Sequence, residues 1–176
     1  IPVTTHQVRL KMVLKDRTVL EGEKEIYLSE RIDQGYSSIF LEPYPKPNPH
    51  AISEIMNADL VVIGPGGLHT SIVPNLLVEG VSQALRETHA KKIYISNLMN
   101  RRGQTTGFKV SDYHSEINRY IGEDIFDYIL VNNQVPDQEL IEKYADEGDL
   151  VENDIKCSRV ISAPLLGEIR APAQGD

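Results

Sequence analysis

The sequence predicts an α/β fold with a mostly parallel sheet and an N-terminal antiparallel β-hairpin. After residue 50, short β-branched runs alternate with helical segments of apolar periodicity, the pattern of right-handed βαβ crossovers. Before residue 30, two segments of alternating apolar and polar residues flank a polar turn, which is typical of a hairpin. A glycine-rich turn over residues 64–67 ends the first β-branched run and precedes a helix.

Composition narrows the class of protein. The chain has 176 residues, of which 40% are hydrophobic and 25% charged, as expected for one globular domain. Its 18 basic and 26 acidic residues give a net charge of −8, which excludes a surface built for nonspecific nucleic-acid binding. No apolar run approaches 18 residues, so we expect no membrane insertion. A single cysteine, Cys157, excludes an internal disulfide and favours a cytoplasmic location.

The N-terminal hairpin carries no chemistry of its own. Residues 3–14 and 18–28 form the expected hairpin around Lys15-Asp16-Arg17, and residues 38–41 a short strand. Asn48 as N-cap and Pro49 at the first helical position predict a helix through Met56. Because the chain opens at Ile1-Pro2 without methionine and runs directly into strand-like sequence, we expect it to be a fragment.

The glycine turn is the strongest candidate for ligand contact. A β-branched strand over residues 60–63 ends at the turn, and a helix begins after it. Glycines let backbone N–H groups approach a ligand closely, and a helix N-terminus favours an anion. The turn matches neither a P-loop, which needs Lys-Ser/Thr, nor GxGxxG, since His69 stands where the third glycine belongs. The residues expected to contact phosphate are Gly64, Gly66, Gly67, His69, Thr70 and Ser71. Alternatively, the glycines only satisfy backbone geometry, and Thr70 and Ser71 cap the helix.

Further elements follow in βαβ order. Apolar residues at helical spacing predict one helix after the turn, from Ile72 to Leu85. Residues 97–109 form a long polar loop with two glycines, which we expect to be functional or mobile. Ser111 is expected to cap a helix ending at Ile121. The other expected elements are strands at 92–96, 128–131 and 159–162 and a helix at 136–145.

Polar clusters gather where parallel strands end. Ligands of such sheets bind beyond the carboxyl ends of the strands, where Asn97, Asn132 and Asn133 fall. These carboxamides could hydrogen-bond a base or ribose, or could close turns. Arg101 and Arg102 could close the loop over phosphate, or be exposed. With no metal-type Cys/His spacing and no Ser-His-Asp pattern, the sequence favours binding of a phosphorylated small molecule over covalent catalysis, and we assign no metal ligand.

Long motifs in the chain resemble a known family. They are PNPHAISEIMNADLVVI, GPGGLHTSIVPNLLV and KKIYISNLMNRRGQTTGFKVSDY, which span residues 47–78 and 91–113. The chain resembles the bacterial gluconeogenesis factor branch of the CofD-like family, relatives of 2-phospho-L-lactate transferase. The likeness covers residues 39–121 and continues more weakly over 131–148.

The resemblance implies a Rossmann-like, doubly wound fold. On this interpretation residues 1–176 are one incomplete domain, with a hairpin addition at 1–30 and an α/β core at 39–166. The family's site is shared with an N-terminal glycine-rich loop of GGGTG type, which this chain lacks. The family usually reads GPGSLYTS, so Gly67 replaces a serine and His69 a tyrosine. Tyr144 matches a segment associated with nucleotide-sugar contact, although its helical position also fits the core.

The resemblance implies a nucleotide-sugar-binding regulatory protein that takes a ligand of the UDP type and affects cell shape and wall synthesis on gluconeogenic carbon. The alternative is a transferase that moves a phospholactyl-type group from a nucleotide donor to a deazaflavin, as in F420 biosynthesis, with Mg²⁺. An interaction scaffold and a homodimer also stay open. The residues favour regulation because they offer no clear general base or carboxylate pair, and we assign no catalytic residue and no definite cofactor.

Overall fold

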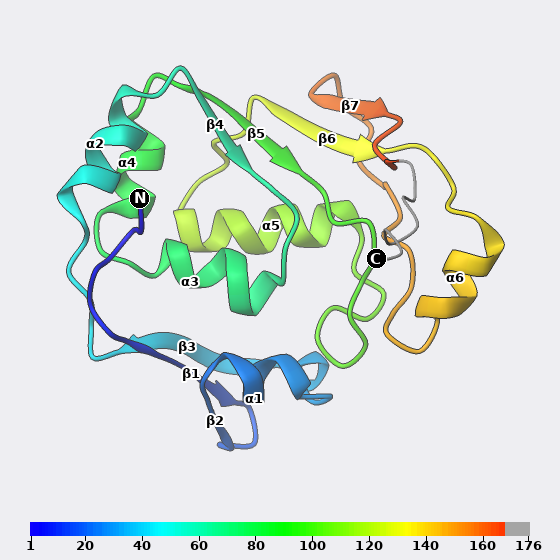
Figure 1. The fold of residues 1–176 in the computed structure, drawn as a ribbon, viewed down its shortest axis with the longest axis horizontal. Coiled ribbons are helices and arrows are strands. Elements are labelled where there is room, and N and C mark those ends of the chain that lie inside the picture. Colours follow the sequence, from blue (N-terminus) through cyan, green and yellow to red (C-terminus); the bar gives the residue numbers. More distant parts are fainter. Residues whose placement is uncertain (168–176) are drawn as a thin grey trace, which may run out of the picture.

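The computed structural model describes residues 1–167 and places helices between two β-sheets (Figure 1). The smaller sheet is antiparallel, with β1 (Arg9–Leu14) between β2 (Val19–Glu21) and β3 (Tyr36–Glu42). Met12 lies opposite Leu20 on one side and Ile39 on the other, and all three side chains are buried. This alternation directs one face of the small sheet toward the helices.

The hairpin is shorter than the sequence predicts. β2 ends at Glu21, and the following residues form α1 (Glu23–Leu28) instead of continuing the strand. Gly22 has φ of 89°, which turns the chain, and the Glu25 carboxylate accepts a hydrogen bond from the Glu21 N–H at 2.8 Å. After η1 (Ile32–Gln34), β3 pairs with β1, so residues expected in the α/β core complete the antiparallel sheet.

The larger sheet confirms the α/β class. Its strands β4 (Leu60–Ile63), β5 (Lys91–Ile95), β6 (Tyr128–Asn132) and β7 (Val160–Ala163) pair in that order, all parallel. The connecting helices are α2 (Pro49–Asn57), α4 (Val81–Glu87), α5 (Val110–Ile121) and α6 (Gln138–Tyr144). Asn48 caps α2 as predicted, since its side chain accepts a hydrogen bond from the His50 N–H.

The helix after the glycine turn is broken, contrary to the single helix predicted. A π-helical turn, η2 (Leu68–Ile72), leads directly into α3 (Val73–Leu76). The chain then turns at Gly80, where φ is 80°, before α4 begins. The predicted cap of α5 is also wrong, because Ser111 lies inside the helix. At the N-terminus of α5, the Asp112 carboxylate accepts a hydrogen bond from the backbone N–H of Lys109, the N-cap residue, at 2.8 Å.

The core fills the space between the two sheets. Its buried side chains come from both sheets and from α1, η2, α3, α4 and α5. Several have no exposed surface at all, namely Met12, Ile26, Val73, Tyr94, Val110, Ile117 and Ile129. α6 contributes no buried residue. The sheets and the intervening helices therefore form one packed unit, and α6 lies outside it.

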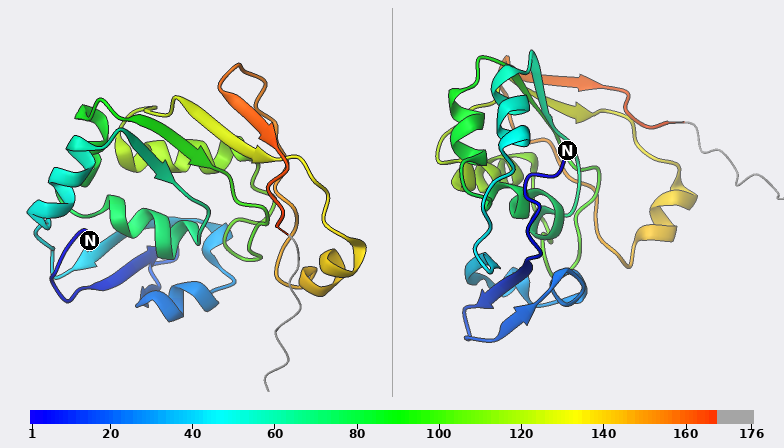
Figure 2. Two further views of the ribbon diagram at one scale, coloured as in Figure 1. Left: turned by 45° about the horizontal axis from the view of Figure 1, so that its top comes forward. Right: turned by 60° about the vertical axis from the view of Figure 1, so that its left-hand side comes forward.

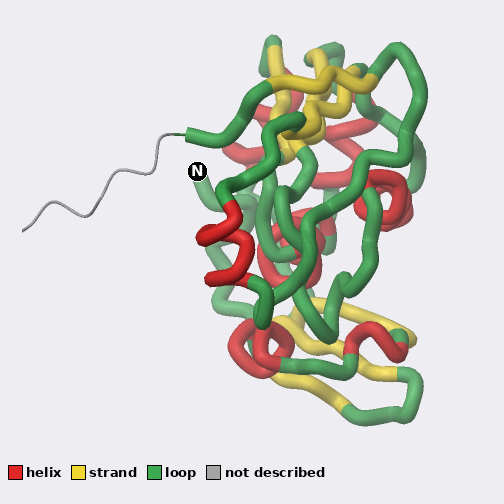
Figure 3. The backbone as a smooth tube through the Cα atoms, turned by 90° about the vertical axis from the view of Figure 1, so that its right-hand side faces the viewer, coloured by secondary structure: helices red, strands yellow, loops and turns green. Residues whose placement is uncertain are grey.

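The outer face of the parallel sheet is apolar and open. Figure 2 shows α3, α4 and α5 on a single face of this sheet, and Figure 3 shows helices between the strands of the two sheets. On the other face, Leu60, Val62, Tyr128 and Ile161 are 51%, 48%, 41% and 44% exposed. β4 is also an edge strand in the described part of the chain. Parallel sheets normally have both faces covered, which makes this surface unusual.

None of the helices within residues 1–167 has both the length and the apolar character needed to cross a lipid bilayer.

Candidate functional site

The glycine turn lies at the carboxyl end of β4, where the sequence places it. β4 ends at Ile63, residues 64–67 form the turn, and η2 begins at Leu68. β5 runs parallel to β4, so Asn97 follows the neighbouring strand at the same edge of the sheet. The turn thus occupies the position at which parallel sheets bind ligands.

The start of η2 presents unused hydrogen-bond donors. The Gly67 carbonyl accepts the N–H groups of Ser71 at 2.7 Å and Ile72 at 3.1 Å, which closes the π-helical turn. By contrast, the N–H groups of residues 67–70 make no hydrogen bond to any other described residue. Free N–H groups at the start of a helix favour a negatively charged ligand.

Close packing explains one of the glycines. A Cβ at Gly67 would lie 2.4 Å from the Thr70 hydroxyl oxygen, so a side chain there would displace Thr70. At Gly66 a Cβ would lie 3.4 Å from the Ser71 Cβ, and at Gly64 it would meet nothing within 4 Å. A side chain at position 67 would therefore require the Thr70 hydroxyl to move, and the glycines of the turn do not have positive φ.

Asn97 fastens the turn to the end of β5. Its amide nitrogen donates to the Gly66 carbonyl at 2.9 Å, and its amide oxygen accepts the Gly66 N–H at 3.4 Å. Both ends of the carboxamide therefore contact backbone. Of the two roles considered for Asn97, contact with a base or ribose and closure of a turn, this geometry corresponds to closure of a turn.

A small cavity lies beside the turn, and we call it the turn cavity. Its volume is about 200 Å³. The lining residues are Tyr27, Gly66, Gly67, Leu68, Asn97, Met99, Asn100, Arg101, Gln104, Thr105 and Tyr113. Arg101 is its charged member. The guanidinium carbon lies 3.6 Å from the centre of the Tyr27 ring, and the Arg101 Nε donates to the Tyr27 carbonyl at 3.1 Å.

An apolar groove of about 300 Å³ lies on the other side of the turn. Gly64, Gly66 and Ser71 line it together with β4, α3 and α4 residues such as Val62, Leu76 and Leu85. Ser71 is exposed and Thr70 half-buried. The turn residues are thus divided between a polar cavity and an apolar groove.

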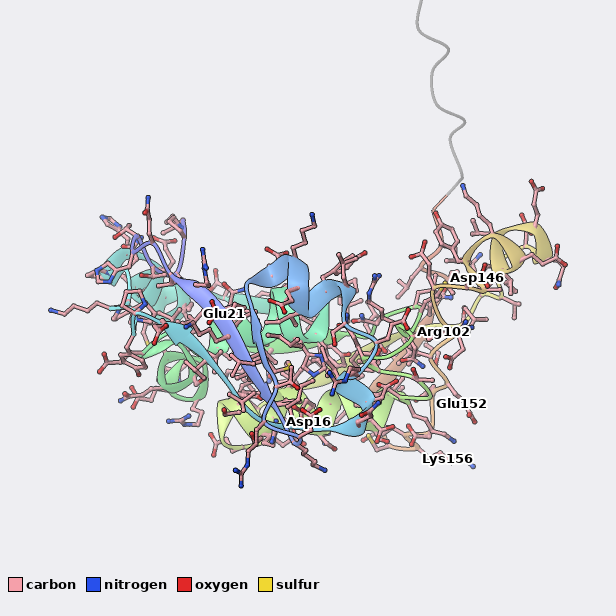
Figure 4. The ribbon with its side chains drawn as sticks, turned by 90° about the horizontal axis from the view of Figure 1, so that it is seen from below. Asp16, Glu21, Arg102, Asp146, Glu152 and Lys156 are labelled. Atoms are coloured by element: carbon pink, nitrogen blue, oxygen red, sulfur yellow. The ribbon has the colours of Figure 1, made fainter. Side chains whose placement is uncertain are left out.

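The loop over residues 97–109 is fastened to the rest of the fold. The N–H groups of Asn100 and Arg102 donate to the carbonyls of Asp149 and Glu147, each at 2.7 Å. The buried Tyr113 hydroxyl is 3.0 Å from the Asn100 Oδ1. The Arg102 side chain donates to the Ala145 carbonyl at 3.1 Å, beside Asp146 (Figure 4). These contacts are those of a packed segment, and neither arginine extends freely over the turn.

Other predicted site residues do not line the turn cavity. The Asn132 amide nitrogen donates to the Gln134 carbonyl at 2.6 Å, and its oxygen accepts the Leu165 N–H at 3.0 Å. Asn133 is exposed, and its backbone N–H donates to the Ala163 carbonyl. Tyr144 is half-buried on α6, with the Lys143 ammonium 5.5 Å from its ring centre.

His69 faces a different cavity, which we call the His69 cavity. Its volume is about 510 Å³, and it lies between the antiparallel sheet, the loop and α5. His69 is 2% exposed, its Nδ1 has no hydrogen-bond partner among the described residues, and Tyr36 packs edge-on at 5.3 Å. Burial lowers the pKa of His69 to about 4, so the imidazole is neutral at pH 7.

Sequence reasoning missed Tyr27, Tyr36 and the pair formed by Glu116 and Arg119. The pair is spaced i, i+3 on α5, a recognisable signal for an ion pair. The tyrosines carried no such signal, because each meets its partner only through the tertiary fold. Within residues 1–167, no group of three or more His, Cys, Asp or Glu side chains is placed to hold a metal ion.

Comparisons with known proteins agree with this architecture. Residues 1–166 match the family model described as 2-phospho-L-lactate transferase CofD. A putative gluconeogenesis factor of Thermotoga maritima is 35% identical over 184 residues, which cover 99% of this chain and 55% of the relative. The gluconeogenesis factor of Bacillus subtilis is 36% identical over 148 residues, which cover 84% of this chain and 46% of the relative.

A solved structure shows the same fold. It is the crystal structure of a member of the UPF0052 family from Bacillus halodurans, with a TM-score of 0.84 and 32% identity. The match covers 96% of this chain and 56% of that one. The chain therefore spans about half the length of the relatives it resembles.

Proposed function

The chain belongs to the CofD family, and from that premise we propose that it binds a nucleotide sugar of the UDP type and acts as a regulatory protein. The observation that carries this proposal is the row of unused N–H groups over residues 67–70 at the carboxyl end of β4. These donors suit the oxygens of a diphosphate. We propose that the diphosphate lies against the start of η2.

Neighbouring side chains support an anion at this point. Arg101 lines the turn cavity and is held by stacking on Tyr27, so its guanidinium is oriented before any ligand arrives. The Thr70 hydroxyl lies beside Gly67 and can donate a further hydrogen bond. A cavity of about 200 Å³ suits phosphate groups better than a whole nucleotide sugar. The nucleoside and sugar would need surface beyond this cavity.

The chemistry of the turn cavity favours binding over group transfer. Its lining contains no Asp, Glu or His, so the described residues present no general base beside the turn. Transfer of a phospholactyl-type group to a deazaflavin would use carboxylates to hold Mg²⁺ near the phosphates. We propose that this chain binds the ligand without that chemistry and keep transfer as the alternative.

The cellular role rests on the names of the relatives. Several are called gluconeogenesis factors or putative gluconeogenesis factors, in support of a role during growth on gluconeogenic carbon. We propose that the protein acts in the cytoplasm and that its ligand-bound state affects cell shape and wall synthesis under those conditions.

Titration calorimetry with UDP-glucose, GDP and a deazaflavin tests the proposal. UDP-glucose should bind, and Arg101→Met should weaken its binding by roughly tenfold to a hundredfold, since a hydrogen bond to a charged group contributes roughly 1.5–3 kcal/mol. Lys24→Met, which removes an exposed cation on α1, is the matched control. Product formation from a nucleotide-phospholactate donor and a deazaflavin would replace the regulatory proposal with the transferase one. Equal UDP-glucose affinity in wild type and Arg101→Met would remove Arg101 from the phosphate site.

A further inference from the structure

The His69 cavity is a second site, which adjoins the turn cavity at Gln104, a residue that lines both. It has a volume of about 510 Å³, within the range of small-molecule sites. Both layers of the fold contribute to its wall. The lining residues are Lys15, Ile32, Asp33, Gly35, Tyr36, His69, Gln104, Thr106, Phe108, Glu116 and Arg119. No residue of the glycine turn itself lines it.

One wall is ordered by its own hydrogen bonds. The Arg119 Nη2 donates to the Glu116 Oε1 and to the Tyr36 hydroxyl, each at 2.6 Å, and to the Tyr120 hydroxyl at 2.9 Å. Tyr36 in turn donates to Glu116. Arg119 and Glu116 therefore neutralise each other and hold the tyrosines in place. This wall needs no charged group from a ligand.

Two further charges in the lining have no such partner. Lys15 and Asp33 form no salt bridge with any residue in the described part of the chain. The Lys15 backbone N–H donates to the Gly35 carbonyl at 3.1 Å, so the backbone of Lys15 lies beside the segment that carries Asp33. The Lys15 side chain passes over Gly35. A Cβ added to Gly35 would lie 2.8 Å from the Lys15 ammonium nitrogen. Among residues 1–167, the Asp33 carboxylate accepts a hydrogen bond only from the Thr106 N–H, at 3.3 Å.

The inner end of the cavity has an unsatisfied polar group and apolar surface. His69 is 2% exposed, and its Nδ1 lacks a hydrogen-bond partner among residues 1–167. Buried polar atoms are nearly always hydrogen-bonded, so an unpartnered one beside a cavity indicates a missing ligand or water. Ile32 and Phe108 add apolar surface to the same lining.

We propose that the His69 cavity binds a zwitterion of the amino-acid class. The ligand carboxylate lies at Lys15, its ammonium group at Asp33, and its apolar part against Phe108 and Ile32. The lining carries two positive and two negative side chains, so it suits a ligand without net charge. The site is therefore chemically distinct from the phosphate site at the turn, and the proposal does not depend on the function proposed above.

Matched ligands give the sharpest test. Thermal-shift screening of the protein with the free α-amino acids is followed by calorimetry, in which the best ligand is compared with its N-acetyl and its amide derivative. We expect the free amino acid to bind at least tenfold more tightly than either derivative, since each derivative lacks one charge. If no free amino acid binds at millimolar concentration, or if the derivatives bind equally well, the proposal is wrong.

Variants then assign each charge to its partner. Asp33→Asn should weaken binding of the free amino acid at least fivefold and leave binding of the N-acetyl derivative unchanged. Lys15→Met should also weaken binding of the free amino acid at least fivefold, and it should leave binding of the amide derivative unchanged. Lys24→Met, exposed and outside the cavity, is the control. If a variant weakens binding of the free amino acid and of the matching derivative equally, the assignment of that charge to its partner is wrong.

A last comparison separates this proposal from the first one. Gly67→Val, which fills space at the turn, should abolish UDP-glucose binding and leave amino-acid binding intact. Asp33→Asn should have the reverse effect. Loss of both ligands in either folded variant would show that the cavities are not independent.

Discussion

Two hydrogen bonds between the Asn97 side chain and the Gly66 backbone join the ends of two parallel strands. The Asn97 carboxamide donates to the Gly66 carbonyl at 2.9 Å and accepts the Gly66 N–H at 3.4 Å. The position of the glycine turn over β4 therefore depends on a side chain that follows β5. A ligand that uses the turn would depend on Asn97 without touching it.

Asn97→Ala should lower the free energy of unfolding by about 1–2 kcal/mol, since it leaves the Gly66 carbonyl without its donor. Urea denaturation measures this change. Asn133→Ala is the matched control, because this exposed strand-end asparagine makes no side-chain hydrogen bond to another described residue. Unchanged stability together with lost UDP-glucose binding would instead make Asn97 a direct ligand contact.

Gly148→Ala should destabilise the protein by about 2 kcal/mol or more, because overpacking forces the backbone apart. A Cβ at this position would lie 1.9 Å from the Asn100 carbonyl oxygen. Thermal and urea unfolding measure the effect. Gly64→Ala provides the comparison, since its Cβ would meet nothing within 4 Å and its φ is not positive. Equal stability of the two variants would show that the loop adapts to a side chain at position 148.

Acid should destabilise the protein partly through His69. Burial lowers the folded-state pKa of His69 from 6.5 to about 4, so between these values the unfolded chain binds the extra proton. Stability from this group is complete above pH 6.5 and falls as the pH drops toward 4. His69→Phe, which keeps a ring against Tyr36, should remove about 2 kcal/mol of the difference in unfolding free energy between pH 7 and pH 4.5.

Urea denaturation at both pH values checks this prediction. His89→Gln, which removes an exposed histidine, is the control variant. If His69→Phe shows the same acid sensitivity as wild type, other groups cause the loss.

Hydrogen exchange should reveal the loop over residues 97–109 as protected. The amides of Asn100 and Arg102 donate to Asp149 and Glu147, so we expect slow exchange at both. Amides of α6, which has no buried residue, should exchange faster. If the amides of Asn100 and Arg102 exchange at the rate of an unstructured peptide, the loop is mobile, as the sequence predicts.

Val62→Lys should reduce self-association without loss of stability. Val62 is 48% exposed on the open apolar face of the parallel sheet, and such patches promote contact between molecules. We expect the free energy of unfolding to change by less than about 0.5 kcal/mol. Val61→Lys, on the core-facing side of the same strand, should destabilise clearly. Sedimentation velocity and urea unfolding measure the two effects, and a monomeric wild type at all concentrations would contradict the prediction.

Local patterns were sufficient for most of the larger sheet. The β-branched runs that become β4, β5 and β6, and the Asn48-Pro49 start of α2, depend on side-chain periodicity and capping, which act within a few residues. The same local reasoning failed at α1. Residues 18–28 are predicted as a single strand, but the last six, EKEIYL, are three charged residues followed by Ile, Tyr and Leu, and they form a helix after Gly22 in which Ile26 is buried.

The sequence by itself therefore determined the order of the parallel strands and the place of the glycine turn after a strand. The tertiary structure alone decided that β4 lies at the edge of the sheet formed by the described residues, that His69 faces another cavity than Gly66, and that Arg101 stacks on Tyr27. Tyr36 and Glu116, which share a hydrogen bond, are 80 positions apart along the chain. Periodicity and caps report on neighbours within a turn or a strand, whereas such contacts arise only when packed layers bring distant segments together.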